Sequence, residues 1–135
     1  MTGRRIGCPL RLLALATGIL GLAGLFLLAP RQPPLVATLQ TEDAALVYEV
    51  RHLGATLTIT RTAGTAATDG HVHQLWLLAP DAAPVSLGLL AENPLSVAYP
   101  MPPRGWSLAV SIEPAGGNPV GAPGGPILLT TTIGG

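Results

Sequence analysis

The sequence contains no lysine and few charged residues of any kind. Seven arginines balance seven aspartates and glutamates, so the formal net charge is zero, and only 10% of the residues are charged. We attribute the absence of lysine to the codon usage of a GC-rich bacterial genome. A nucleic-acid-binding protein needs a basic surface to meet the phosphates. The charge balance therefore argues against nucleic acid as a partner.

Cysteine is nearly absent as well. Cys8 is the only cysteine among the 135 residues, so no disulfide can form within the chain. It precedes a long apolar run, whereas the cysteine of a lipoprotein follows such a run, and this order argues against lipidation. The remainder of the chain thus needs neither an oxidising compartment nor a thiol for its stability or chemistry.

One long uncharged run lies near the N-terminus. Residues 12–29 read LLALATGILGLAGLFLLA, which is about the length that a transmembrane helix needs. Three arginines in residues 1–11 precede it and Arg31 follows it, so the positive charge predicts a cytoplasmic N-terminus. The prolines of residues 30–34 predict the end of the helix and an extended linker. A cleavable signal peptide is the alternative interpretation of the same run.

Beyond the linker the apolar residues recur with a period of two, which is typical of half-buried β-strands. Leu57 and Ile59, for example, alternate with threonines. The short connection at residues 52–54 predicts a hairpin, and the almost fully apolar run HVHQLWLL predicts a strand inside a sheet. The segments that we expect as strands are residues 35–39, 46–51, 55–61, 71–78, 85–90, 95–99, 106–112 and 127–133.

About seven or eight short strands without helical periodicity predict an antiparallel β-sandwich for residues 35–135. The expected fold class is therefore all-β, preceded by one transmembrane helix. Aromatic residues make up only 4% of the chain. Trp76 lies inside an apolar run and Trp106 alternates in phase with three aliphatic residues, so we expect both tryptophans to be core anchors.

The last two expected strands are joined by a long stretch that is rich in glycine and proline. Four prolines in the stretch from Glu113 through Pro126 restrict φ while glycines supply turns, so this loop can hold a shape without buried apolar contacts. We expect it to be exposed and to add little to core stability. Functional loops have this composition and so do plain crossovers between sheets, and composition alone favours the crossover. Glu113 at the base could accept hydrogen bonds from loop N–H groups. The candidate interaction residues are Glu113, Pro114, Ala115, Gly116, Gly117, Asn118 and Pro119.

Metal and enzyme chemistry find little support in the sequence. His71 and His73 lie on one face of an expected strand, as two metal ligands would, and His52, Glu49 or Asp69 could be a third ligand. None of these has a telling spacing, and histidines near a turn are usually solvated. Nucleophile, phosphate-loop and dinucleotide motifs are absent from the sequence. We therefore expect no metal, no cofactor and no catalytic activity.

Three stretches of the sequence together resemble the C-terminal domain of the anti-sigma-K factor (RskA) family. They are HQLWLLAP at residues 73–80, SLGLL at residues 86–90 and LAVSIEPAGGNPVGAPGGPILL at residues 108–129. Within the last of them, Glu-Pro-Ala-Gly-Gly at residues 113–117 is the most specific part. The family has the same order of parts: a membrane helix, a proline-containing linker and a small extracytoplasmic β-sandwich. The resemblance covers roughly residues 30–133.

The resemblance implies signal transduction without catalysis at the inner membrane. Its members inhibit a sigma factor through an N-terminal cytoplasmic domain, and proteases of the membrane or periplasm release that inhibition under control of the outer domain. Only about ten residues precede the expected membrane helix here, too few for a sigma-binding domain. We therefore expect a start further upstream, a split or decayed gene, or a sandwich that serves alone as a tethered sensor. The alternative, which belongs to a different class of function, is an exported structural or binding sandwich without a role in transcription.

Overall fold

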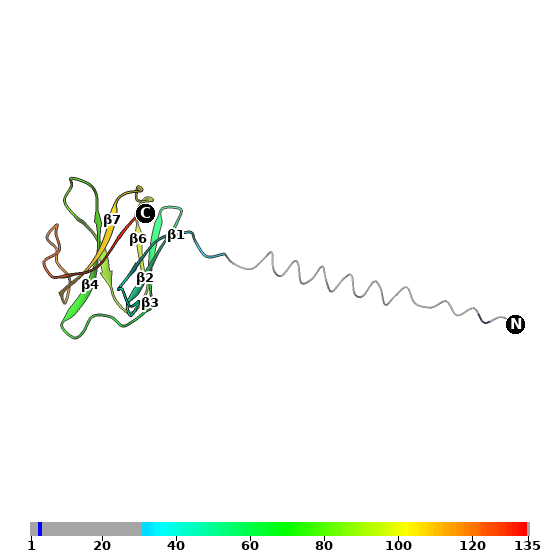
Figure 1. Ribbon diagram of the computed structural model, residues 1–135, viewed down its shortest axis with the longest axis horizontal. Helices are drawn as coiled ribbons and strands as arrows, with labels where there is room; N and C mark the ends of the chain where they lie inside the picture. The colour runs from blue at the N-terminus through cyan, green and yellow to red at the C-terminus, as the bar shows by residue number, and fades with distance from the viewer. Residues whose placement is uncertain (1–2, 4–30, 135) are drawn as a thin grey trace. The chain divides into compact units, whose positions relative to one another are not determined.

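The computed structural model of the protein describes residue 3 and residues 31–134. This part of the chain is built from β-strands that all pair antiparallel (Figure 1). The all-β prediction is confirmed, and so is the number of strands. The eight strands are β1 (Leu35–Gln40), β2 (Val47–Leu53), β3 (Thr56–Ala63), β4 (His71–Leu78), β5 (Val85–Leu90), β6 (Leu95–Ala98), β7 (Ser107–Pro114) and β8 (Ile127–Thr132).

The strands form two four-stranded sheets, which pack face to face as a sandwich (Figure 1). The first sheet has the order β1-β2-β3-β6 and the second has the order β5-β4-β7-β8. Strand β4 therefore lies inside its sheet, as its apolar sequence predicted. It pairs with β7 along its whole length, from His71 opposite Pro114 to Leu78 opposite Ser107.

The predicted hairpin is present between β2 and β3. Leu53 pairs with Thr56, and Gly54 turns the chain with a φ of 63°. Tight hairpin turns need positive φ, which glycine adopts without a steric penalty. Strand β2 continues to Leu53, two residues beyond the expected end, because the turn is shorter than the sequence suggested.

The main core lies between the two sheets. We call the face of each sheet that meets the other sheet its inner face and the opposite one its outer face. Alternation places one aliphatic side chain in every two on the inner face, where contact with the opposite sheet removes it from water. The largest buried residues of this core are Leu39, Tyr48, Val50, Leu57, Ile59, Leu75, Leu77, Leu108 and Val110.

The outer face of the second sheet is also buried along β4 and β7. Its side chains alternate with those of the inner face, and each is at most 2% exposed: Gln74, Trp76, Ala109, Ser111 and Glu113. Residues 115–126, which join β7 to β8 and which we call the covering loop, are hydrogen-bonded to this face. The covering loop is mostly exposed, as expected. It is nevertheless hydrogen-bonded to this second buried layer, through Gln74 on β4 and Glu113 on β7. Its small contribution to core stability stays a prediction.

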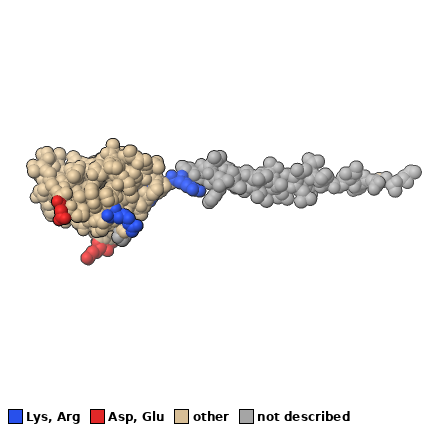
Figure 2. All heavy atoms as spheres, turned by 90° about the horizontal axis from the view of Figure 1, so that it is seen from above, with Lys and Arg blue, Asp and Glu red and all other residues tan. Residues whose placement is uncertain are grey.

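The short N-terminus at residues 1–11, apart from Gly3, and the transmembrane helix expected at residues 12–29 lie outside the described residues. Within residues 31–134 no helix is long and apolar enough to cross a membrane. Pro33–Gly135 forms a compact unit of its own. Figure 2 shows one face of this unit, on which the few charged side chains lie scattered and no basic patch gathers.

Candidate functional site

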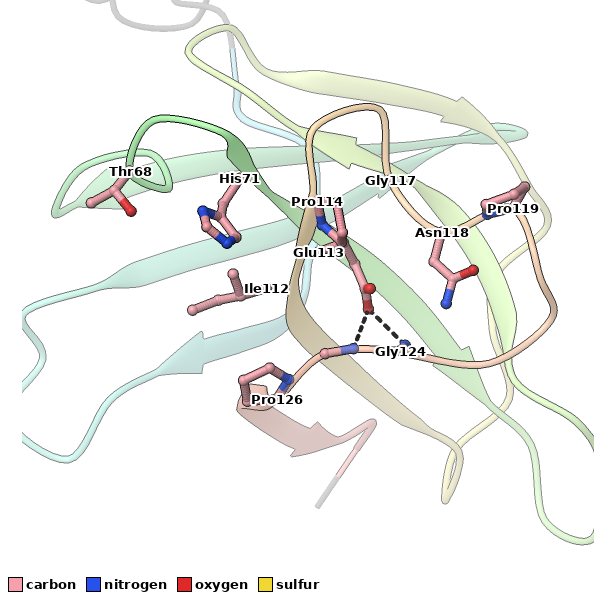
Figure 3. A pocket seen from close by; sticks show the side chains of 11 residues that line it. Thr68, His71, Ile112, Glu113, Pro114, Gly117, Asn118, Pro119, Gly124 and Pro126 are labelled. Atoms are coloured by element: carbon pink, nitrogen blue, oxygen red, sulfur yellow. Dashed lines mark hydrogen bonds between the residues drawn. The ribbon is translucent and has the colours of Figure 1, made fainter.

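Glu113 connects the end of β7 to the covering loop. Its side chain is only 1% exposed, and its Oε1 atom accepts three hydrogen bonds. The donors are Ser111 Oγ at 2.7 Å, the N–H of Gly124 at 3.0 Å and the N–H of Gly125 at 3.3 Å, of which the last two are drawn in Figure 3. The bonds from loop N–H groups are those that the sequence suggested for a carboxylate at this position. They attach the far end of the loop to the strand.

A buried hydrogen-bonded chain leads from Glu113 to Trp76. The indole Nε1–H of Trp76 donates to Ser111 Oγ over 2.9 Å, and the Ser111 hydroxyl donates to Glu113. Trp76 is fully buried, but its side chain lies on the outer face of the sheet and not between the sheets. Trp106 precedes β7 and packs half-buried against the main core. The energetic role of both as core anchors stays a prediction.

Asn118 makes the second attachment of the covering loop. Its backbone N–H donates to Gln74 Oε1 over 2.7 Å, and Gln74 Nε2 donates back to the Asn118 carbonyl over 3.1 Å and to Ser86 Oγ over 2.7 Å. The Asn118 side chain also bonds within the loop, donating to the carbonyl of Ala122 and accepting from the N–H of Val120. The loop is thus fixed near both of its ends.

The start of the loop is shaped by a tight turn. The N–H of Gly117 donates to the carbonyl of Pro114 over 2.9 Å, and Gly116 and Gly117 have φ values of 94° and 78°. The N–H of Ala115 donates to the carbonyl of Gly70 over 3.0 Å. These bonds account for the Glu-Pro-Ala-Gly-Gly sequence, since only glycine adopts two successive positive φ angles easily.

A cavity of about 730 Å³ lies beside this network (Figure 3), which is a size typical of small-molecule sites. Five of the seven candidate interaction residues line it, whereas Ala115 and Gly116 do not. The sequence did not single out Thr68, Ile112 or the glycines of the far loop end as lining residues. The complete lining is Thr68, His71, Ile112, Glu113, Pro114, Gly117, Asn118, Pro119, Gly124, Gly125 and Pro126.

The second carboxylate oxygen of Glu113 is unpartnered. Oε2 is buried and has no hydrogen-bond partner. The ion pairs among residues 31–134 join Arg51 to Glu49 and Arg61 to Glu92, and neither includes Glu113. Most buried polar atoms in proteins have a hydrogen-bond partner, so a buried carboxylate oxygen without a donor is rare.

The two histidines that the sequence suggested as metal ligands, His71 and His73, lie in different environments and have different hydrogen-bond partners. His71 is exposed at the start of β4, and its Nδ1 atom lies 3.2 Å from the carbonyl of Asp69. His73 is buried, and its Nδ1 atom lies 2.8 Å from the hydroxyl of Tyr48 on the opposite sheet. Burial lowers the pKa of His73, and the positive charge of Arg61 lowers it further.

Two of the other candidate ligands, His52 and Glu49, are engaged elsewhere. His52 Nε2 lies 3.2 Å from the carbonyl of Tyr99, and Glu49 pairs with Arg51 at 3.0 Å. No three side chains of the His, Cys, Asp or Glu type are arranged to hold a metal ion in the part of the chain that the structure describes.

Comparison with known proteins places the chain in a family. A sequence model described as the C-terminal part of anti-sigma-K factor RskA matches residues 12–127. No curated protein and no solved structure matches the chain. The family match extends over most of the sequence, from the apolar run to the first residue of β8, and it includes the cavity and the covering loop. The chain belongs to the family of the anti-sigma-K factor RskA C-terminal domain.

Proposed function

We propose that the protein is a membrane-anchored, non-catalytic regulator of the anti-sigma-K type. Its β-sandwich acts outside the cytoplasm and takes part in the control of sigma-factor-dependent transcription. The observation that carries this proposal is the family match over residues 12–127. The apolar run and the excess of arginine before it support a single membrane span with a cytoplasmic N-terminus.

Within this function the covering loop and its cavity form the sensing surface. A sensor needs a surface whose state can be passed to the rest of the domain. The hydrogen-bonded chain from the loop through Glu113 and Ser111 to Trp76 offers such a connection. Loops held by a rigid scaffold are also where binding residues commonly lie.

The proposal is tested by transcript profiling in the native host. Deletion of the gene should change a group of transcripts whose promoters share one sigma-factor recognition sequence, and the wild-type gene should restore them. A variant with residues 119–123 replaced by glycine and serine should be produced at normal level but should not restore the response. The conservative control is Glu42→Gln, an exposed position outside the cavity, which should restore it fully.

Two results would contradict the proposal. An unchanged transcript profile after deletion would favour the alternative, an exported structural or binding sandwich without a role in transcription. In intact spheroplasts, added protease should digest the sandwich while the N-terminus is protected. Protection of the sandwich with an accessible N-terminus would overturn the orientation.

A further inference from the structure

The two ends of the sandwich differ, and we call the end at which the chain enters β1 the near end (Figure 1). Leu35 at the start of β1 pairs with Arg51. Thr56 at the start of β3 pairs with Leu53 and with Ala98 at the end of β6. The start of β1, the turn between β2 and β3 and the end of β6 therefore all lie at the near end. The connections that leave the opposite end, which we call the far end, are residues 41–46, 64–70, 91–94 and 115–126.

The linker that follows the apolar run is bonded to the near end. Arg51 Nη1 donates to the carbonyl of Pro33 over 2.9 Å, and the His52 N–H donates to the carbonyl of Pro34 over 3.1 Å. Only three residues separate Pro33 from the end of the run at residue 29, and an extended chain of this length reaches about 14 Å. The headgroup layer outside the hydrocarbon core is about 5–8 Å thick. A membrane span at residues 12–29, as in the proposed function, thus keeps the near end at the headgroups or just outside them.

The near end exposes large apolar side chains. Leu35 is 50% exposed, Leu53 at the hairpin turn is 66% exposed and Met101 in the loop after β6 is 52% exposed. The N–H of Tyr99 donates to the carbonyl of Ala55 over 2.9 Å, which fixes that loop to the hairpin. A single exposed apolar residue is ordinary. Here three come from three separate segments and lie at the same end, which indicates a contact surface.

Formal charge is divided between the two ends in the same sense. The near end has arginine in the linker, on β2 and in the β6–β7 loop, although Glu49 pairs with the arginine of β2. Its connections contain one acidic residue, whereas those of the far end contain four. Anionic headgroups attract arginine and repel carboxylates. The near-end residues are Arg31, Arg51, Arg104 and Asp81, and the acidic residues of the far-end connections are Glu42, Asp43, Asp69 and Glu92.

We propose that the near end of the sandwich binds the lipid surface of the membrane. Leu35, Leu53 and Met101 enter the headgroup layer, and the neighbouring arginines lie beside anionic phosphates. The cavity lies at the far end, because the start of β4 and the end of β7 line it, and it therefore faces away from the bilayer. This inference rests on the membrane span of the proposed function and adds a contact that the span alone does not require.

The test uses the complete chain in vesicles of phosphatidylcholine and phosphatidylglycerol. Cys8→Ser removes the native thiol, and Ala55→Cys at the exposed hairpin turn carries an environment-sensitive fluorophore. A lipid with a nitroxide on its headgroup should quench this label about threefold or more above the same label at Glu42→Cys of the far end. A glycine–serine insertion of about ten residues after Gln32 lengthens the tether. The quenching at Ala55→Cys should persist, because the contact and not the tether holds the near end.

Three substitutions in the lengthened chain identify the groups that make the contact. Leu53→Ser combined with Met101→Ser should lower the quenching to the value at Glu42→Cys. Val120→Ser is the matched control, because Val120 on the covering loop is 69% exposed and Leu53 is 66% exposed, and it should leave the quenching unchanged. Arg104→Gln should lower the quenching in vesicles that contain phosphatidylglycerol but not in pure phosphatidylcholine.

The possible results separate this inference from the proposed function. Quenching that disappears in the lengthened wild-type chain would show that the short tether alone kept the label near the lipid, and would overturn the proposal. So would unchanged quenching in the Leu53→Ser, Met101→Ser chain. Label emission that follows the protein-to-lipid ratio would assign the near end to a second copy of the chain instead. Extraction of the chain from the vesicles by sodium carbonate would contradict the membrane span itself, whereas a retained chain with an unquenched label would overturn only the surface contact.

Discussion

At the scale of single residues, the outer face of the second sheet buries hydrogen-bonded polar side chains beside apolar ones. Trp76 contributes a large buried ring, and its one polar atom has a partner in Ser111. Gln74 is likewise bonded at both ends of its amide. Buried polar groups contribute to stability when they are paired and destabilise when they are not. Individual substitutions on this face should therefore have large effects.

The two tryptophans should differ in their contribution to stability. Truncating a fully buried tryptophan to alanine costs about 3–5 kcal/mol, and Trp76→Ala should fall in this range. Trp106→Ala should cost less, because Trp106 is only half-buried. Urea unfolding of both variants measures the difference. Equal costs would show that the outer layer contributes less than its burial suggests.

Protonation of His73 should make stability depend on pH. Its pKa is lowered in the folded state from the ordinary value of 6.5, first by burial and then by Arg61. A depressed pKa means that the unfolded chain takes up the proton first as pH falls. The contribution of His73 is therefore complete above pH 6.5 and declines as pH falls below it towards the lower folded pKa.

This pH dependence can be followed by urea midpoints at several pH values between about 5 and 8. Exchanging His73 for glutamine should flatten the curve between those values, whereas His71→Gln, at the exposed start of the same strand, should leave it unchanged. The hydroxyl of Tyr48 and the guanidinium of Arg61 are the groups that act on His73. An unaltered curve in the His73 variant would contradict the assignment.

At the scale of elements, the covering loop depends on glycine for its close approach to β7. A Cβ atom on Gly125 would overlap the backbone carbonyl of Ile112, whereas one on Gly121 would meet only the carbonyl of Pro84 at 3.9 Å. Overpacking of this kind typically costs about 1–3 kcal/mol. Gly125→Ala should therefore loosen the loop and shift Trp76 fluorescence to longer wavelength. Gly121→Ala is the matched control and should match the wild type; a red shift there too would disprove the contact argument.

The strands were predictable because each carries a regular alternation. The predicted ends of β4 and β5 agree with the observed ones, and the turn glycine of the β2–β3 hairpin was visible in the sequence. Apolar residues alternate along a strand whenever one face of the strand packs against an apolar layer. A strand can therefore be recognised from this alternation without knowing which strand it pairs with. The central place of β4 followed from its nearly continuous apolar run.

The second buried layer was not predictable from the same pattern. Ala109, Ser111 and Glu113 alternate with the core residues of β7, and small or charged side chains normally indicate the solvated face. Glu113 is buried where the covering loop is hydrogen-bonded to it, and the alternation within a strand does not indicate a contact with a segment outside that strand. The concentration of glycine in the loop was the available signal, since close approach to backbone requires it.

At the scale of the whole molecule, the sandwich should fold without help from metal or disulfide. Pro33–Gly135 is a compact unit with its own core and contains no cysteine. A fragment of residues 33–135 should give a β-type circular dichroism spectrum and one cooperative melting transition. The melting temperature should be the same with and without EDTA. A lower value in EDTA would require a metal ligand set that the described residues do not provide.

The covering of β4 on both faces and both edges has a kinetic consequence for its backbone amides. Its N–H groups are bonded to β5 on one side and to β7 on the other, beneath the core below and the loop above. Their exchange with deuterated solvent should require unfolding of the whole domain. The amides of Gly124 and Gly125 are released as soon as the loop lifts from Glu113. Exchange should therefore proceed in two separate units, the loop first and the strand last.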